Sequence, residues 1–278
     1  MQRIAFFQHS GDITEARLTR VRGSSPREAG ATIWVSERDI HGTVGGGQLE
    51  YMVIDQARAL LASGGQTGDM DVPLGPEIGQ CCGGRVEVAL TRLDQAAQRE
   101  VEQRLLAERE NFPHVYILGA GHVGRALAAC CALLPVKTIL IDSRAEELAR
   151  ATAPVEQRLS PIPEADIRSA PANSAFVVLT HDHAQDFLLT AEALTRGDAA
   201  YVGMIGSATK RVSFRNWCRQ AQPDTDQTPL VCPIGGPSDI DKRPEVIAAM
   251  VAAEVMAAFA KNNKPAETPQ PARQISRT

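Results

Sequence analysis

Apolar and polar positions alternate in the first third of the chain. Residues 15–22 and 85–90 show the period-2 pattern of strands that bury one face, and residues 32–36 and 69–74 are shorter strand candidates. Residues 48–62 instead repeat apolar positions at helical spacing. The pattern predicts a small N-terminal α+β domain.

The pattern changes after about residue 114, where short continuous apolar runs alternate with helical segments. The runs lie at 115–118, 136–141, 175–180, 200–205 and 230–232, with a weaker candidate at 155–159. Helices are expected at 125–134 and 246–259. Two more are expected, one that follows 181–183 and ends near 196, and one that follows 206–211 and ends near 220. Residues 161–173 are expected to be a proline-rich connection. Continuous apolar strands between helices are typical of a parallel sheet covered on both faces. The fold class predicted for this part is a Rossmann-like α/β domain.

The same pattern sets the predicted domain boundaries. An N-terminal domain is expected over 1–92, a polar linker helix over 93–113 and the Rossmann-like domain over 114–260. Residues 261–278 hold three prolines and almost no apolar residues, so a disordered tail is predicted.

A glycine fingerprint follows the first apolar run of the second domain. Gly119, Gly121 and Gly124, with His122 between them, form G-x-G-x-x-G between a strand and a helix, and Asp142 ends the next strand. In this context the glycines allow a tight turn, close approach of a phosphate to backbone N–H groups, and close packing of helix on strand. Asp142 is expected to accept hydrogen bonds from a ribose.

Further polar groups follow later strands, at the edge where open parallel sheets bind ligands. For His181, Asp182 and His183 we retain three interpretations: hydrogen bonding or acid–base work, structural capping, and metal binding by the two histidines. Ser207 and Lys210 stand at a helix start and suit a phosphate, with a solvated surface as the alternative.

Two loops of the first domain carry candidate chemistry. Gly45, Gly46 and Gly47 precede the predicted helix, where exposed backbone N–H groups can cradle an anion, unless they form a simple turn. Cys81 and Cys82 lie between Gln80 and a Gly-Gly pair in a loop between strands. Gln80 offers a donor and an acceptor, and the nearby Arg85 can lower a thiol pKa. The alternative is two incidental thiols in a turn.

Composition bounds the class of protein. The 278 residues are 44% hydrophobic and 22% charged, with a formal net charge of −4, which argues against a nucleic-acid-binding surface. No apolar run is long enough to span a membrane, and no signal peptide is recognisable, so a cytoplasmic protein is expected. The six cysteines lack zinc-site spacing and are interpreted as free thiols, with Cys130 and Cys131 packed in a helix.

Seven segments of these loops and turns occur together in a distinctive order. They are GSSPR at 23–27, GTVGGG at 42–47, GQCCGG at 79–84, GAGHV at 119–123, HDH at 181–183, GSATKR at 206–211 and PIG at 233–235. The combination resembles the XdhC/CoxI family of xanthine dehydrogenase accessory proteins, over about residues 15–260.

The resemblance implies a cofactor chaperone and not a stand-alone catalyst. Such proteins bind the molybdenum cofactor (molybdopterin), hold it for sulfuration with a cysteine desulfurase, and deliver it to xanthine dehydrogenase. Gln80, Cys81 and Cys82 would handle the cofactor, the two thiols as molybdenum contacts or sulfur carriers, and Gly45–Gly47 would cradle the pterin or its phosphate. An anionic cofactor of this kind also suits Arg27 and Arg85, and thiolates suit its metal.

Two other functions compete with this hypothesis. The fingerprint ending at Asp142 also fits an NAD(P)-dependent oxidoreductase, which leaves the cysteine loop without a task. A non-enzymatic scaffold that only docks partner proteins is the second alternative. A nucleotide in the Rossmann crevice remains open, and a homodimer is the default expectation.

Overall fold

The structure is a computed structural model that describes residues 6–7, 11–76, 79, 83–236 and 241–262. Contacts within the chain divide it into two compact units, Met1–Glu108 and Arg109–Thr278. Each unit is described by itself.

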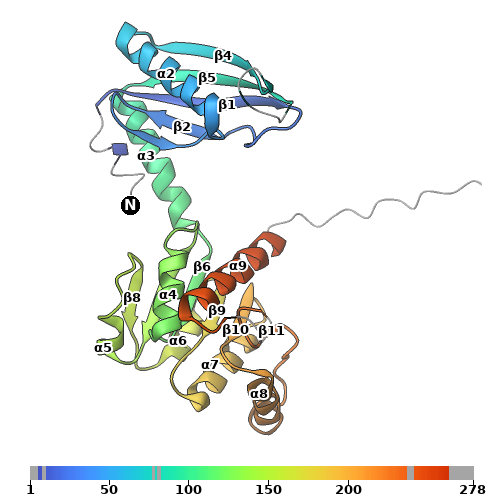
Figure 1. The fold of residues 1–278 in the computed structure, drawn as a ribbon. Helices are drawn as coiled ribbons and strands as arrows, with labels where there is room; N and C mark the ends of the chain where they lie inside the picture. The colour runs from blue at the N-terminus through green and yellow to red at the C-terminus, as the bar shows by residue number, and fades with distance from the viewer. Residues whose placement is uncertain (1–5, 8–10, 77–78, 80–82, 237–240, 263–278) are drawn as a thin grey trace, which may run out of the picture. The chain divides into compact units, whose positions relative to one another are not determined.

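The first unit is built on an antiparallel sheet of five strands in the order β3-β2-β1-β5-β4 (Figure 1). Its strands are β1 (Ile13–Arg22), β2 (Thr32–Val35), β3 (Ile40–Gly42), β4 (Thr67–Pro73) and β5 (Arg85–Leu93). Helix α2 (Gly47–Ser63) covers one face, where Leu49, Val53 and Ala57 pack on inward-facing residues such as Leu18 and Val88.

The other face of this sheet is covered at one end by α3 (Gln95–Glu110). Val101 and Leu105 of α3 bury Trp34 of β2, together with Phe6 and Phe7. Alternate residues of β1 and β5 therefore serve two different cores, which explains the period-2 pattern in their sequences.

The second unit has a parallel sheet of six strands in the order β11-β10-β9-β6-β7-β8. The strands are β6 (His114–Leu118), β7 (Lys137–Asp142), β8 (Glu156–Leu159), β9 (Ala175–Val178), β10 (Tyr201–Met204) and β11 (Leu230–Val231). Numbered along the chain from β6, this is the doubly wound Rossmann order, with its switch point between β6 and β9. The predicted fold class is confirmed.

Helices cover both faces of this sheet (Figure 1). Helices α4 (His122–Cys131), α5 (Ala145–Leu148) and α9 (Pro244–Asn262) pack on one face, against Val115, Ile117 and Val177 among others. Helices α6 (Pro163–Ser169), α7 (His183–Thr195) and α8 (Ala208–Ala221) pack on the other, against Phe176, Val178 and Met204. Two buried faces account for the continuous apolar runs of these strands.

Three local predictions differ from the structure. The segment expected to be a proline-rich connection contains α6, because Pro163 stands in the first turn, where a proline fits a helix. Helix α4 begins three residues before the predicted start, directly after Gly121. Helix α9 continues to Asn262, past the predicted start of the tail at residue 261.

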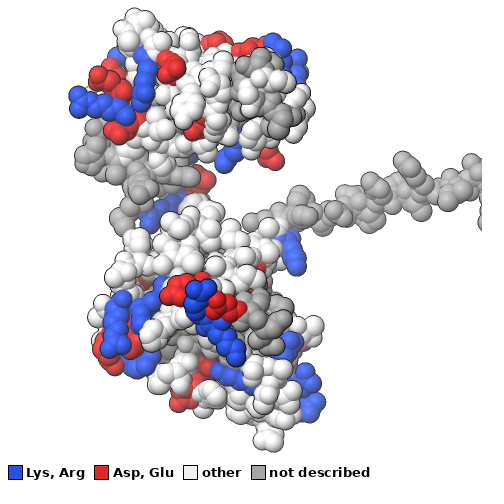
Figure 2. Space-filling model, viewed as in Figure 1, with Lys and Arg blue, Asp and Glu red and all other residues white. Residues whose placement is uncertain are grey.

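On the face that Figure 2 shows, basic and acidic side chains are intermixed on both units. Among the described residues, no helix combines the length and the apolar character needed to cross a bilayer.

Candidate functional site

Three of the motif loops in the first unit meet at one place. Ser24 pairs with Gly83 in an isolated bridge, and a Cβ added to Gly84 would lie 2.0 Å from the carbonyl oxygen of Ser24. A Cβ added to Gly45 would lie 3.1 Å from the Cβ of Pro26. The segment 23–27 therefore lies beside both 42–47 and 83–84, and only glycine allows the approach of 84 to 24.

The central residues of the cysteine loop are not among those that the structure describes. Gln80, Cys81 and Cys82 lie outside the described residues, so their predicted tasks stay predictions. The flanking Gly79 and Gly83 have φ of 65° and 67°, and a Cβ added to either would meet no described atom within 4 Å. Open space beside these glycines, and beside Gly46, leaves room for a ligand to approach the backbone.

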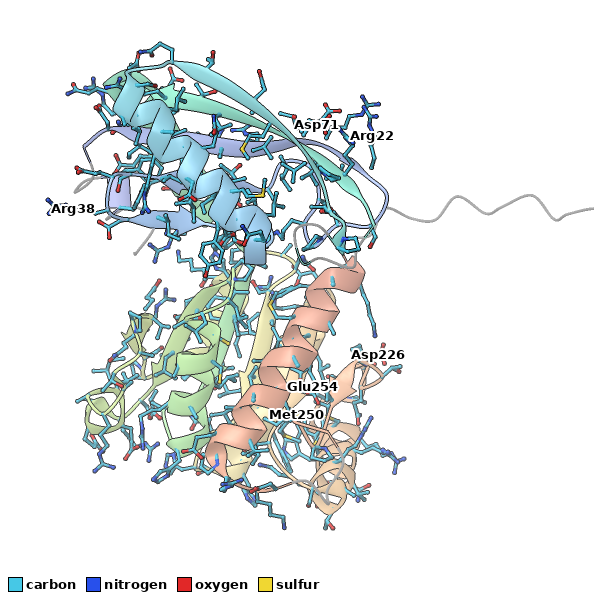
Figure 3. The ribbon with its side chains drawn as sticks, turned by 45° about the horizontal axis from the view of Figure 1, so that its top comes forward. Arg22, Arg38, Asp71, Asp226, Met250 and Glu254 are labelled. Atoms are coloured by element: carbon cyan, nitrogen blue, oxygen red, sulfur yellow. The ribbon has the colours of Figure 1, made fainter. Side chains whose placement is uncertain are left out.

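Arg27 is an exposed cation beside this group of loops. Its Cγ would lie 3.8 Å from a Cβ added to Gly45, so the side chain starts next to the triple-glycine turn. Arg85, the other predicted cation, is engaged elsewhere: its guanidinium donates to both carboxylate oxygens of Asp71, at 2.6 and 2.8 Å. That hydrogen bond lowers the pKa of Asp71, and Figure 3 shows Asp71 near Arg22 at one end of the sheet.

The predicted anion cradle already holds an acidic side chain of the protein. One carboxylate oxygen of Glu50 accepts from the N–H groups of Val44 and Gly46, at 3.1 and 3.2 Å, and from the Thr43 hydroxyl at 2.5 Å. An anion can use those two amides only if Glu50 moves. Sequence reasoning missed Glu50, although an acid in the first turn after a glycine run is the available signal.

The glycine fingerprint of the second unit has the expected geometry. Gly119 has φ of 123°, and a Cβ there would lie 2.4 Å from the carbonyl oxygen of Leu179. Gly121 is the N-cap residue of α4 and has open space around it. A Cβ at Gly124 would lie 1.9 Å from the carbonyl oxygen of Gly119, so glycine is required where α4 crosses the strand end. His122 is the first residue of α4.

Asp142 is used within the protein in a way the sequence did not indicate. Its carboxylate is 4% exposed, accepts from the Ala120 amide at 2.7 Å and receives the Arg144 guanidinium at 3.0 Å through both oxygens. Burial alone would raise the pKa of Asp142, but the hydrogen bonds from Arg144 and from the two amides outweigh it and lower the pKa. A ribose would have to compete with these donors.

Of the three interpretations given for residues 181–183, structural capping applies to Asp182. Its carboxylate caps α7 by accepting from the Ala184 and Gln185 amides at 2.6 and 3.2 Å, and these bonds lower its pKa. His181 and His183 on either side are exposed. Within the described ranges, no group of three His, Cys, Asp or Glu residues could hold a metal ion, so the metal interpretation gains no support.

Lys210 is bound to a buried acid that sequence reasoning also missed. Its ammonium lies 2.5 Å from the carboxylate of Asp186, which is fully buried and also accepts from the Thr180 amide and hydroxyl. Ser207 caps α8 by accepting from the Lys210 amide. Of the two groups expected to bind a phosphate, Lys210 thus joins α8 to α7, and Ser207 is used as the N-cap of its own helix.

A small hollow remains between the ends of β6, β7 and β9. Gly119, Asp142, Ser143, His181 and Gln185 are among its lining residues, and its volume is about 10 Å³. That is room for one water molecule. The hollow lies at the carboxyl ends of the strands, in the place where Rossmann proteins bind nucleotides.

The described cysteines are packing residues. Cys130, Cys131, Cys218 and Cys232 are free thiols of the second unit. Burial, and then the neighbouring Cys130, raises the pKa of Cys131 to about 12, and burial also raises the pKa of Cys218 and Cys232. A raised pKa disfavours the reactive thiolate form at Cys131, Cys218 and Cys232, and Cys130 packs against the core of its unit. Cys81 and Cys82 therefore stay the candidates for thiol chemistry.

Fold and loops together define a two-unit α/β protein. One unit has a parallel sheet in Rossmann order, and the other has an antiparallel sheet in which segment 23–27 lies beside 42–47 and beside 83–84. The XdhC Rossmann domain matches residues 115–255, and the XdhC and CoxI family matches residues 10–71. The chain belongs to the XdhC/CoxI family.

Two relatives show how far the likeness extends. The uncharacterized protein YqeB of Escherichia coli (strain K12) is 26% identical over 261 residues, which are 90% of this chain and 44% of that protein. The chain therefore spans less than half the length of this relative. A crystal structure described as a xanthine dehydrogenase from Bacillus halodurans superposes with a TM-score of 0.78 at 18% identity, covering 96% of this chain and 97% of that one. At this identity the likeness concerns the fold.

Proposed function

We propose that this protein is an accessory chaperone of xanthine dehydrogenase that binds the molybdenum cofactor, holds it while a cysteine desulfurase supplies sulfur, and passes it to the enzyme. Membership of the XdhC/CoxI family supports the accessory task. The observation that carries the binding claim is the meeting of segments 23–27, 42–47 and 83–84 beside the cysteine loop.

The chemistry of these loops fits an anionic ligand with a soft metal centre. Arg27 supplies an exposed positive charge, and the open space beside Gly46, Gly79 and Gly83 lets a flat pterin approach the backbone. Thiolates of Cys81 or Cys82 are suitable ligands for molybdenum. Bound there, the cofactor would be the cargo of the chain, and the chain's residues would hold it and shield it from water.

Removing the positive charge of Arg27 tests whether these loops bind the cofactor. Arg27→Ala should weaken binding of purified molybdenum cofactor about tenfold, because one charge-assisted contact contributes on the order of 1.5 kcal/mol. The measurement is an anaerobic titration followed by quenching of tryptophan fluorescence. Arg20→Ala is the matched control, since Arg20 is equally an exposed arginine of the first unit and makes only a 3.9 Å contact to Glu87.

Equal affinities of Arg27→Ala and the wild type would remove Arg27 from the binding site. Absence of any cofactor binding by the wild type would overturn the proposal as a whole.

A further inference from the structure

Tyr51 is the exposed aromatic residue of this protein. All tryptophans, tyrosines and phenylalanines of the chain fall within the described residues, and each of the others is buried or half-buried. Tyr51 keeps 66% of its surface in solvent. Among the described residues, no hydrogen bond, ion pair or ring contact involves Tyr51. The packing of the first unit therefore does not account for an aromatic residue at this position.

The position of Tyr51 places its ring beside the triple-glycine turn. Gly47 begins α2 and Tyr51 follows it by four residues, so the two residues share one side of the helix. A side chain on a helix leans toward the N-terminus and covers the preceding turn. The Tyr51 ring therefore leans over Gly47, toward the open space beside Gly46, where an added Cβ would meet no described atom within 4 Å.

The neighbouring residues of α2 hold this arrangement in place and add polar groups to it. The Glu50 carboxylate accepts from the amides of Val44 and Gly46, so the first turn of the helix is fixed on the glycine turn. Gln48 is exposed three residues before Tyr51, on the same side of the helix, and offers an amide donor and an acceptor. Because the backbone is fixed before a ligand arrives, binding here has a small ordering cost.

We propose that Tyr51 is the platform on which the pterin ring of the cofactor stacks, with Gln48 at the edge of the ring and Arg27 at the phosphate. This inference rests on the proposed function, since it assigns a residue to the ligand of that same site. A tyrosine ring offers a rigid face for offset stacking with a flat heteroaromatic ring, at a low cost in side-chain entropy. The glycines beside it lack a Cβ, so a flat ring has room over their backbone.

Two substitutions separate the contribution of the ring from that of the hydroxyl. Tyr51→Ala should weaken binding of purified molybdenum cofactor about tenfold, because it removes the stacking of one heteroaromatic ring on an aromatic side chain. Tyr51→Phe keeps the ring and should bind within about twofold of the wild type. Leu106→Ala, at a 42% exposed apolar residue of α3 in the same unit, is the matched control and should bind like the wild type. Anaerobic titration of the full chain measures all four affinities.

The dependence of binding on salt distinguishes stacking from a charge contact. Stacking on an uncharged ring is not screened by ions, whereas the attraction between Arg27 and a phosphate is. Tyr51→Ala should therefore raise the Kd by the same factor at low and at high salt. Arg27→Ala should raise the Kd more at low salt than at high salt. The same titrations, repeated at two salt concentrations, measure both factors.

The outcomes separate this inference from the proposed function. A wild type that binds no cofactor would contradict the proposed function, and the assignment of Tyr51 would be overturned with it. A wild type that binds the cofactor while Tyr51→Ala binds it equally well would overturn the stacking on Tyr51 alone. An equal loss of affinity in Tyr51→Ala and Tyr51→Phe would also overturn the stacking, since the hydroxyl and not the ring would then make the contact.

Discussion

At the scale of single residues, buried or half-buried acids take the place of the ligand contacts that the motifs suggested. Glu50 accepts the amides of the triple-glycine turn, Asp142 accepts the amide of the fingerprint turn, and Asp186 binds Lys210. Each acid stabilises a loop that would otherwise leave backbone donors without partners. These contacts make the loops rigid before any ligand arrives.

Glu50 gives a direct test of that interpretation. Glu50→Ala should lower the free energy of unfolding by about 1–3 kcal/mol, because it removes a charged acceptor from two amides and a hydroxyl. Urea denaturation measures the change. Glu108→Ala, at an exposed position of α3, should change stability by less than about 0.5 kcal/mol. Equal, small effects of the two substitutions would mean that the Glu50 contacts contribute nothing.

Asp142 predicts a dependence of stability on pH. Its pKa is lowered in the folded state, so its contribution is fully present above the unfolded value of 3.8 and is lost as pH falls through the folded pKa. The wild type should therefore lose more stability between pH 7 and pH 3 than Asp142→Asn does. Denaturant unfolding at both pH values measures this.

The control for Asp142 is Asp224→Asn, at an exposed position of the second unit. Its loss of stability on acidification should match that of the wild type. An unchanged acid-induced loss in Asp142→Asn would show that the bonds to Ala120 and Arg144 do not stabilise the folded state.

At the scale of elements, the crossing of α4 over β6 depends on one glycine. Gly124→Ala should cost more than about 3 kcal/mol or prevent folding, because the new Cβ would lie 1.9 Å from a carbonyl oxygen. Gly121→Ala, three residues earlier, meets open space and should cost less than about 1 kcal/mol. Thermal unfolding and soluble yield compare the two, and similar behaviour of both variants would contradict the packing described for this turn.

Elements with a strong period were predictable from sequence, and those set by tertiary contacts were not. The strands β6, β7, β9 and β10 are continuous apolar runs because both faces of the sheet are buried, and this burial is visible in composition. Strand β3 has only three residues and exists because it pairs with β2, for which no local pattern is available. Helix α6 lies in a segment whose prolines suggested a connection.

The candidate site, like the fold, was predictable from sequence only in part. The glycines of the fingerprint and of the motif loops could be assigned, because close approach and positive φ leave only glycine. The partners of Asp142, Lys210 and the triple-glycine turn could not be assigned. These partners depend on which side chains the fold brings together from the ends of distant strands. An aspartate that binds a ribose and an aspartate that binds a backbone amide look the same in the sequence.

At the scale of the whole molecule, the two units contribute different properties. The first unit carries the motif loops beside the cysteines, and the second carries a Rossmann crevice whose strand ends hold Asp142 and Asp186 in contacts within the unit. The central claim is that the chain carries the molybdenum cofactor and that the cysteine loop holds it.

The most direct test is the molybdenum and pterin content of protein purified without oxygen from its native host. The wild type should contain molybdenum and pterin together, and Cys81→Ser combined with Cys82→Ser should retain less than about a tenth of both, since a metal ligand pair is lost. Cys130→Ser, at a half-buried thiol of the second unit, should retain the wild-type content. A wild type that contains a nucleotide and no molybdenum, or a double variant that keeps its full cofactor, would contradict the account.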